Sequence, residues 1–193
     1  IFTFSGGADT ITLVDDGTVG NGLQTIDSTL GESVTFLRPT TSLTINAGGG
    51  TDTVNLSRVD STFTANVTVN GDAATDVVNF LDVLNVGAGT VIINSESIAF
   101  DNATNGSLTT TGNVTLNASL TNITSNGVGT DVTANGLTID AVTGINIDTS
   151  VATINGSVSG TGDLVIDEAN AVTLTDVDTA DGDVTITAGG NLT

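Results

Sequence analysis

The side chains in this sequence that are best suited to metal binding or acid–base chemistry are carboxylates, and they recur in one short sequence frame. The frame is an acid, any residue, an apolar residue, any residue and a second apolar residue. It begins at Asp9, Glu32, Asp52, Asp76 and Glu96, in steps of 23, 20, 24 and 20 residues. If the chain stacks at this period, the acids form one column of carboxylates.

Glycine-rich turns precede two of these acids, in the runs Gly6-Gly7-Ala8-Asp9 and Gly48-Gly49-Gly50-Thr51-Asp52. These turns resemble degenerate copies of the Gly-Gly-x-Gly-x-Asp repeat of RTX proteins, and the resemblance implies Ca²⁺ held by the acid frame. Stacked carboxylates and turn carbonyls are the hard oxygen ligands that calcium prefers. A metal-free interpretation stays open, because turn carboxylates also accept hydrogen bonds from backbone N–H groups.

A second acidic cluster lies near the end of the chain, at Asp176, Asp178, Asp181 and Asp183. Its spacing resembles the start of an EF-hand calcium loop, which implies a second metal site. Ala180 shifts the register and no glutamate closes the loop, so a solvated turn between strands is the alternative.

Arg38 and Arg58 are the only basic residues in the chain. Pectate lyases and related parallel β-helices combine calcium-binding acids with a catalytic Arg or Lys, which makes a polysaccharide lyase the remote enzymatic alternative. Ion pairs with turn acids such as Asp60 are the simpler role for both arginines. A strongly negative surface would also repel an anionic polysaccharide.

Composition excludes several function classes. The chain has no His, Cys or Lys, so a Ser-His-Asp triad, a cysteine nucleophile and a zinc site of the usual kinds are absent. With 22 acids against two arginines, the net charge of -20 disfavours nucleic acids and anionic membranes as partners. No apolar run approaches the ~20 residues of a membrane-spanning helix. We therefore expect no catalytic residues and no cofactor other than calcium.

The elements that position these residues are short strands. Apolar residues alternate with polar ones, and matched segments recur 20 residues apart: Val34–Phe36 with Val54–Leu56, Val78–Phe80 with Ile98–Phe100, and Leu164–Ile166 with Val184–Ile186. A second apolar pair precedes most frames, as at Leu43/Ile45, Val67/Val69 and Val91/Ile93. Each unit cannot bury its apolar side alone, so stacking on like units completes the core.

The pattern predicts an all-β parallel β-helix, or β-solenoid, of roughly nine coils of about 20–24 residues. Phe80 should lie over Phe100, and Arg38 over Arg58. We treat residues 1–193 as a single solenoid and a fragment of a longer protein. Its composition changes along the chain: residues 1–101 form acid-frame coils that contain Phe and Arg, and residues 102–193 form coils rich in Thr, Val, Asn and Gly.

The run from Gly162 to Thr193, above all Gly-Asp-Val-Thr-Ile-Thr-Ala-Gly-Gly-Asn-Leu-Thr, resembles the repeats of filamentous-haemagglutinin-type adhesins and giant bacterial surface proteins. The resemblance implies a right-handed β-helix in an extracellular or cell-surface stalk, filament or adhesin, without enzymatic activity. The expected partners are neighbouring coils or subunits of a larger surface protein, glycans or host-cell surfaces, and further copies of the chain in a homo-oligomer or filament. A calcium-stabilised adhesion or carbohydrate-binding module is the alternative.

Overall fold

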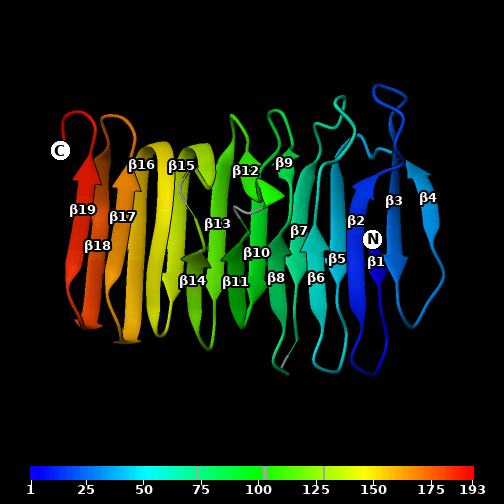
Figure 1. Ribbon diagram of the computed structural model, residues 1–193, viewed down its shortest axis with the longest axis horizontal. Coiled ribbons are helices and arrows are strands. Elements are labelled where there is room, and N and C mark those ends of the chain that lie inside the picture. The colour runs from blue at the N-terminus through cyan, green and yellow to red at the C-terminus, as the bar shows by residue number, and fades with distance from the viewer. Residues whose placement is uncertain (73, 102–103, 128) are drawn as a thin grey trace.

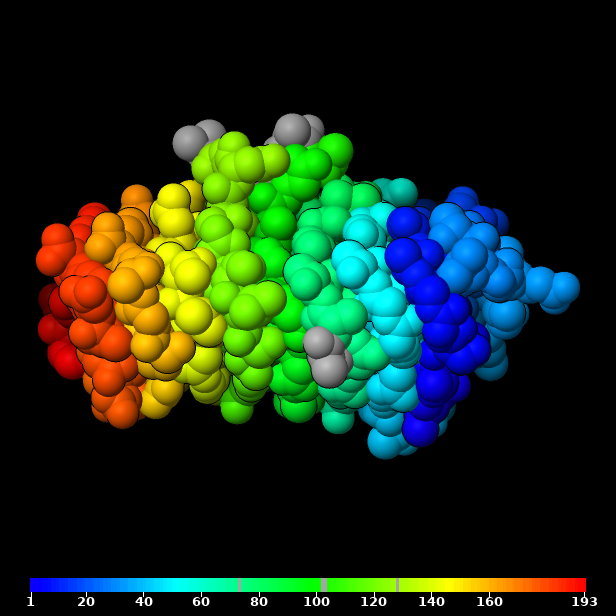
Figure 2. Space-filling model, turned by 90° about the horizontal axis from the view of Figure 1, so that it is seen from below, coloured from blue at the N-terminus to red at the C-terminus, as the bar shows by residue number. Residues whose placement is uncertain are grey.

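Alternating apolar and polar residues give this chain strands that bury one side and expose the other, and these strands wind into a β-solenoid of about six turns. The computed structural model describes residues 1–72, 74–101, 104–127 and 129–193. The strands lie across the rod and stack along its axis, from β4 and β3 at one end to β19 at the other (Figure 1). Figure 2 shows the same order as successive bands of colour along an elongated surface.

Two long stacks of parallel strands form the main walls. Face 1 consists of β1 (Phe2–Thr3), β5 (Ser42–Asn46), β7 (Asn66–Asn70), β10 (Val91–Ser95), β13 (Asn113–Ala118), the second half of β15 (Val132–Ala141), the last part of β16 (Gly144–Thr161) and β18 (Thr173–Asp181). Face 2 consists of β2 (Thr10–Asp15), β6 (Thr53–Leu56), β8 (Val77–Phe80), β11 (Ser97–Phe100), β14 (Asn122–Ser125), the start of β16, β17 (Leu164–Glu168) and β19 (Val184–Ala188).

A shorter third wall closes the cross-section in the middle of the rod. It contains β9 (Val83–Asn85), β12 (Ser107–Thr109), the start of β15 and the middle of β16. The 18 residues of β16 therefore pass through all three walls, turning corners without leaving the extended conformation. The later coils keep the stacking of the earlier ones while their turns become part of long strands.

The core is a continuous column of aliphatic side chains with a few phenylalanines. Parallel register places like over like: Val67 pairs with Val91, Val69 with Ile93, and Phe80 with Phe100. The rings of Phe80 and Phe100 stack with centroids 4.5 Å apart and planes 5° apart. This confirms the expected vertical neighbours in these coils and the repeat-stacking argument behind them.

The first coil departs from the expected pattern. Strand β3 (Leu23–Ser28) pairs antiparallel with β2, and β4 (Val34–Leu37) pairs antiparallel with β3. The prediction that Val34–Phe36 stacks on Val54–Leu56 is therefore wrong, because β6 pairs with β2 instead. The connection between β2 and β3 contains Gly17, Gly20 and Gly22 at φ of 96°, 79° and 76°, values that glycine adopts without steric cost.

This antiparallel hairpin, residues 23–37, changes two further expectations. Arg38 follows β4 at the end of the rod and does not lie over Arg58, which follows β6. The turn count is about six instead of nine. One reason is that the coil from Asp9 to Asp52 spans 43 residues, since it includes the hairpin, whereas Asp52 to Asp76 spans 24. The proposed change of composition at residues 101/102 falls beside residues 102 and 103, which lie outside the described residues.

Candidate functional site

Four of the five predicted acids stand in one column along the rod. Asp9, Asp52, Asp76 and Glu96 each immediately precede a strand of face 2, and all four are buried. We call these four residues the acid column. The sequence frame located them correctly because the acid always stands one residue before a strand whose register is fixed by its buried apolar residues.

Hydrogen bonds run through the acid column from coil to coil. The backbone N–H of each acid donates to the carboxylate of the next acid along the rod. The donor–acceptor distances are 2.7 Å for Asp9 to Asp52, 2.8 Å for Asp52 to Asp76 and 3.0 Å for Asp76 to Glu96. The carboxylates are thus the acceptors of backbone N–H groups that the metal-free interpretation predicted, although these donors belong to a neighbouring coil.

Hydroxyl groups complete both ends of the acid column. Ser28 and Thr29 donate to the carboxylate of Asp9, and Ser119 donates to Oε1 of Glu96. Burial by itself raises the pKa of Asp9, but the bonds from Ser28, Thr29 and the Leu30 backbone together bring it below its usual value. Asp9 is therefore a well-stabilised anion, held partly by the end of β3.

Asp52 is the exception within the column. Its Oδ1 accepts the Asp9 N–H, while its Oδ2 is buried without a hydrogen-bond partner. Burial raises the pKa of Asp52, opposed by the bond from the Asp9 backbone and reinforced by the charges of Asp76, Asp9 and Asp72. In the next coil, the corresponding oxygen of Asp76 accepts the backbone N–H of Asp72 at 2.9 Å. Asp52 is thus the member of the acid column whose carboxylate has a buried oxygen without a hydrogen-bond partner.

Glu32 does not belong to the acid column. It lies exposed in the connection between β3 and β4, two residues before β4 begins. The sequence frame matched it because Glu32-Ser-Val-Thr-Phe has the same alternation as the stacked coils. Alternation reports which side of a strand is buried but not whether its neighbour runs parallel or antiparallel.

Within the described ranges, no group of three or more Asp, Glu, His or Cys side chains is arranged to hold a metal ion. The oxygens of the acid column that would have to bind calcium are largely engaged with N–H and O–H donors. Calcium binding stays a prediction, and Asp52 is the residue at which a cation would find a carboxylate oxygen without a donor.

The C-terminal acids lie mostly along a strand instead of in a curled loop. Asp176, Asp178 and Asp181 are in β18, and the backbone N–H of Asp183 donates to Asp163 Oδ1 at 2.9 Å. An EF-hand loop wraps its carboxylates around one point. An extended strand instead spaces successive side chains along a sheet surface.

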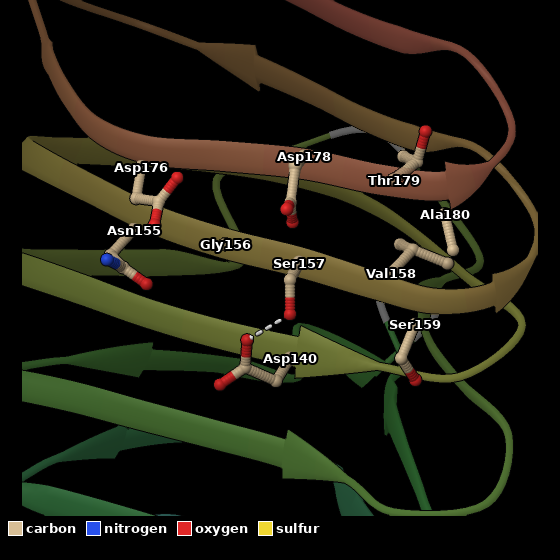
Figure 3. A pocket seen from close by; sticks show the side chains of 10 residues that line it. All are labelled: Asp140, Asn155, Gly156, Ser157, Val158, Ser159, Asp176, Asp178, Thr179 and Ala180. Atoms are coloured by element: carbon tan, nitrogen blue, oxygen red, sulfur yellow. Dashed lines mark hydrogen bonds between the residues drawn. The ribbon is translucent and has the colours of Figure 1, made fainter.

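A shallow hollow of about 390 Å³ lies over the outside of face 1, where β15, β16 and β18 meet (Figure 3). Register places Ser157 between Asp140 and Asp178, and Ser157 Oγ donates to Asp140 Oδ1 at 2.7 Å. Asn155 stands beside Asp176 in the same way. The hollow offers several hydrogen-bond acceptors, an arrangement that suits a hydroxyl-rich ligand.

Sequence reasoning missed Asp140, Asn155 and Ser157. They lie in strands with different connection lengths, and no fixed spacing links them to Asp176 and Asp178. Only the register between β15, β16 and β18 brings the five together.

The two arginines do not converge on a site. Arg38 is half-buried beside Gly22, and Arg58 is exposed. Within the part of the chain that the structure describes, neither forms an ion pair. Asp60, the expected partner, accepts the backbone N–H groups of Gly20 at 2.6 Å and Thr62 at 2.8 Å. The hydroxyl of Thr62, more than any other group, lowers the pKa of Asp60 to about 2.

Comparison of the chain with protein-family models, with curated proteins and with solved structures gives no match. No helix in the described part of the chain has the length and hydrophobicity needed to cross a membrane. What is established for this chain is therefore its β-solenoid fold and the geometry of its acids.

Proposed function

We propose that this chain is a non-enzymatic structural or adhesin segment of an extracellular or cell-surface protein, acting as a stalk, filament or spacer. The observation that carries the proposal is the parallel pairing of strands along faces 1 and 2 from the first coil to the last, which continues through the register shifts between β16 and β18. Each coil is hydrogen-bonded to the next, so bending the rod requires breaking several bonds at once. A stiff rod of this kind holds two sites at a fixed distance.

Outward-facing amides add to this stiffness. The Nδ2 of Asn70 donates to Asn46 Oδ1 at 2.9 Å, and the Nδ2 of Asn94 donates to Asn70 Oδ1 at 3.0 Å. Such a ladder ties successive coils together on the solvent side of face 1, while the aliphatic column ties them on the inside. The ladder also leaves face 1 uncharged between β5 and β13, although the chain as a whole is strongly acidic.

Limited proteolysis combined with small-angle X-ray scattering tests the spacer role. We expect an elongated particle and resistance to proteases throughout the stacked coils. Rapid cleavage inside faces 1 and 2 under native conditions would contradict the proposal. Antibodies against the chain should label intact cells of its source, and labelling only after lysis would refute the surface location.

Adhesion is tested by binding to glycan arrays and to immobilised host-cell surfaces. The hollow between β15, β16 and β18 is the preferred contact, because its acceptors suit sugar hydroxyls. Asp178→Ala should weaken such binding, and Asp183→Ala, which lies outside the hollow, is the matched control. Equal effects of both variants would assign the binding to general charge.

The lyase alternative is tested by following the unsaturated product of pectin or alginate cleavage. We expect no activity. Activity that disappears in Arg38→Ala or Arg58→Ala would replace the structural proposal with an enzymatic one.

A further inference from the structure

Strand β4 is the last described strand at one end of the solenoid, and no described strand covers its outer edge. It pairs with β3 on one side, and no other described strand pairs with it. Its sequence, Val34-Thr35-Phe36-Leu37, is uncharged and strongly β-forming. Exposed edges of this kind pair with other strands unless charges, prolines or bulges block them.

The hydrogen bonds to β3 show which groups of β4 face outward. The N–H of Arg38 donates to Gly22 O at 2.7 Å. In an antiparallel ladder the bonded pairs alternate, so Phe36 and Val34 bond to β3 in turn. The N–H and C=O groups of Ser33, Thr35 and Leu37 therefore point away from β3, towards an additional strand.

We infer that β4 is a dimerisation edge, on which β4 of a second copy of this chain pairs antiparallel about Thr35. A twofold axis through the two Thr35 residues joins the outward groups of all three residues: Thr35 bonds to Thr35, and Ser33 to Leu37 of the other copy. Because directly opposed residues share a face in an antiparallel pair, the inner side of one hairpin continues the inner side of the other.

Charge complementarity selects a second copy as the occupant. In this register Glu32 stands directly opposite Arg38 of the second copy, and the twofold axis repeats the pair. These positions are non-hydrogen-bonded pairs, in which side chains approach most closely. Arg38 has no ion-pair partner among the described residues of its own chain, and Glu32 is exposed. Arg38 and Glu32 thus each face a side chain of opposite charge in the dimer.

Apolar side chains at the same edge favour the same pairing. Val34 is 42% exposed, although it lies on the inner side of the hairpin in line with Ile26, which is 1% exposed. Phe36 contacts Phe2 with ring centroids 4.9 Å apart, and its other side is only partly covered. In the dimer Val34 faces Phe36 of the second copy, so the core continues across the junction.

The twofold pairing uses the same edge on both copies, so it closes at two and does not propagate into a filament. Sedimentation at near-physiological ionic strength tests it, since salt screens the net charge of -20 per chain. We expect reversible dimers whose fraction rises with protein concentration. A wild-type chain that stays monomeric throughout, or that forms open-ended polymers, overturns the inference.

Two backbone variants locate the edge. Thr35→Pro removes an outward N–H without removing a bond to β3, and proline is tolerated on such edges. It should give a monomer at concentrations where the wild-type chain is a dimer. Thr35→Val removes the hydroxyl contact with Thr25 (3.1 Å) but keeps the N–H, so it should still dimerise. Equal dimerisation of both variants would place the interface elsewhere.

Charge exchange provides a test that does not depend on how proline affects the hairpin. Glu32→Arg and Arg38→Glu, each alone, should weaken dimerisation by about tenfold or more, because two attractive cross-strand pairs become repulsive. A mixture of the two variants should form heterodimers, and the double variant should recover the homodimer. Failure of both recoveries, with each variant folded by circular dichroism, refutes the Glu32–Arg38 pairing.

Discussion

Two substitutions in the acid column should change stability in opposite directions, although each replaces one buried carboxylate by an amide. In Asp52→Asn, the amide oxygen can keep the bond from the Asp9 N–H, and the NH₂ group takes the place of an oxygen that has no partner. In Asp76→Asn, both oxygens are in use. Oδ1 accepts from the Asp52 backbone and Oδ2 from the Asp72 backbone.

The expected magnitudes follow from these bonds. Asp52→Asn removes a buried charge that its neighbours disfavour, and it exchanges an unpartnered oxygen for an unpartnered NH₂ without losing a hydrogen bond. The gain from the lost charge should exceed the cost of the buried NH₂ and stabilise the fold by about 1 kcal/mol at pH 7. Asp76→Asn places NH₂ against one of two N–H donors, so a charge-assisted bond is lost and a buried donor stays unpaired. The cost should be about 2–3 kcal/mol. Loss of one charge is common to both variants, so their difference isolates the hydrogen bonds.

The pH dependence of the free energy of unfolding provides an independent test of whether Asp52→Asn is stabilising. Burial raises the folded-state pKa of Asp52 above its usual 3.8. Protonation therefore favours the folded state, and the wild-type chain loses stability as pH rises from 3.8 through that raised pKa. Asp52→Asn lacks this loss. Its advantage over the wild-type chain should be small near pH 4 and largest at neutral pH.

Urea unfolding followed by circular dichroism is the measurement, with the midpoint compared at constant slope. The reasoning fails if Asp52→Asn destabilises as much as Asp76→Asn. Oδ2 of Asp52 would then have a partner in solution. If added Ca²⁺ stabilised the wild-type chain but not Asp52→Asn, that partner would be the cation.

Three further outcomes are expected. Chelator should leave the melting temperature unchanged, because donors already occupy most column oxygens, and a rise on adding Ca²⁺ would contradict this. Phe80→Ala should cost about 3–5 kcal/mol, since Phe80 is fully buried against Phe100; a loss below 1 kcal/mol in urea unfolding would show that the stack contributes little. Asp60, with its pKa near 2, supports the fold above pH 3.8 and loses that support as pH falls towards 2. In Asp60→Asn, the melting temperature should therefore fall less between pH 3.8 and pH 2 than it does in the wild-type chain. An equal fall in both chains would show that Asp60 does not cause this loss of stability.

Much of the fold was predictable because a solenoid makes its tertiary contacts at a nearly constant sequence distance. Alternation identified the buried side of most strands, and the steps of 24 and 20 residues identified the strand above, as for Asp52, Asp76 and Glu96. The acid column was visible for the same reason. Its Asp or Glu always stands beside a strand whose register is fixed by burial.

The direction and partner of β4 were decided only by the tertiary structure. The segment Val34–Leu37 has the same alternation as a stacked strand, and its spacing of 20 from Val54–Leu56 matched the repeat. Glycines at positive φ let the chain reverse, so β2 pairs with β3 on one side and β6 on the other. The same reversal placed Glu32 outside the acid column.

Outside the β3–β4 hairpin, the amino-acid sequence by itself determined most of the buried positions and the stacking of like segments. It could not determine the hydrogen-bond partners of each carboxylate, because these partners depend on turn geometry. Asp76 has the Asp72 N–H beside it, whereas Asp52 has no corresponding donor. Burial depends on residue type at a periodic position, but hydrogen bonding depends on distances of a few tenths of an ångström that only the folded chain sets.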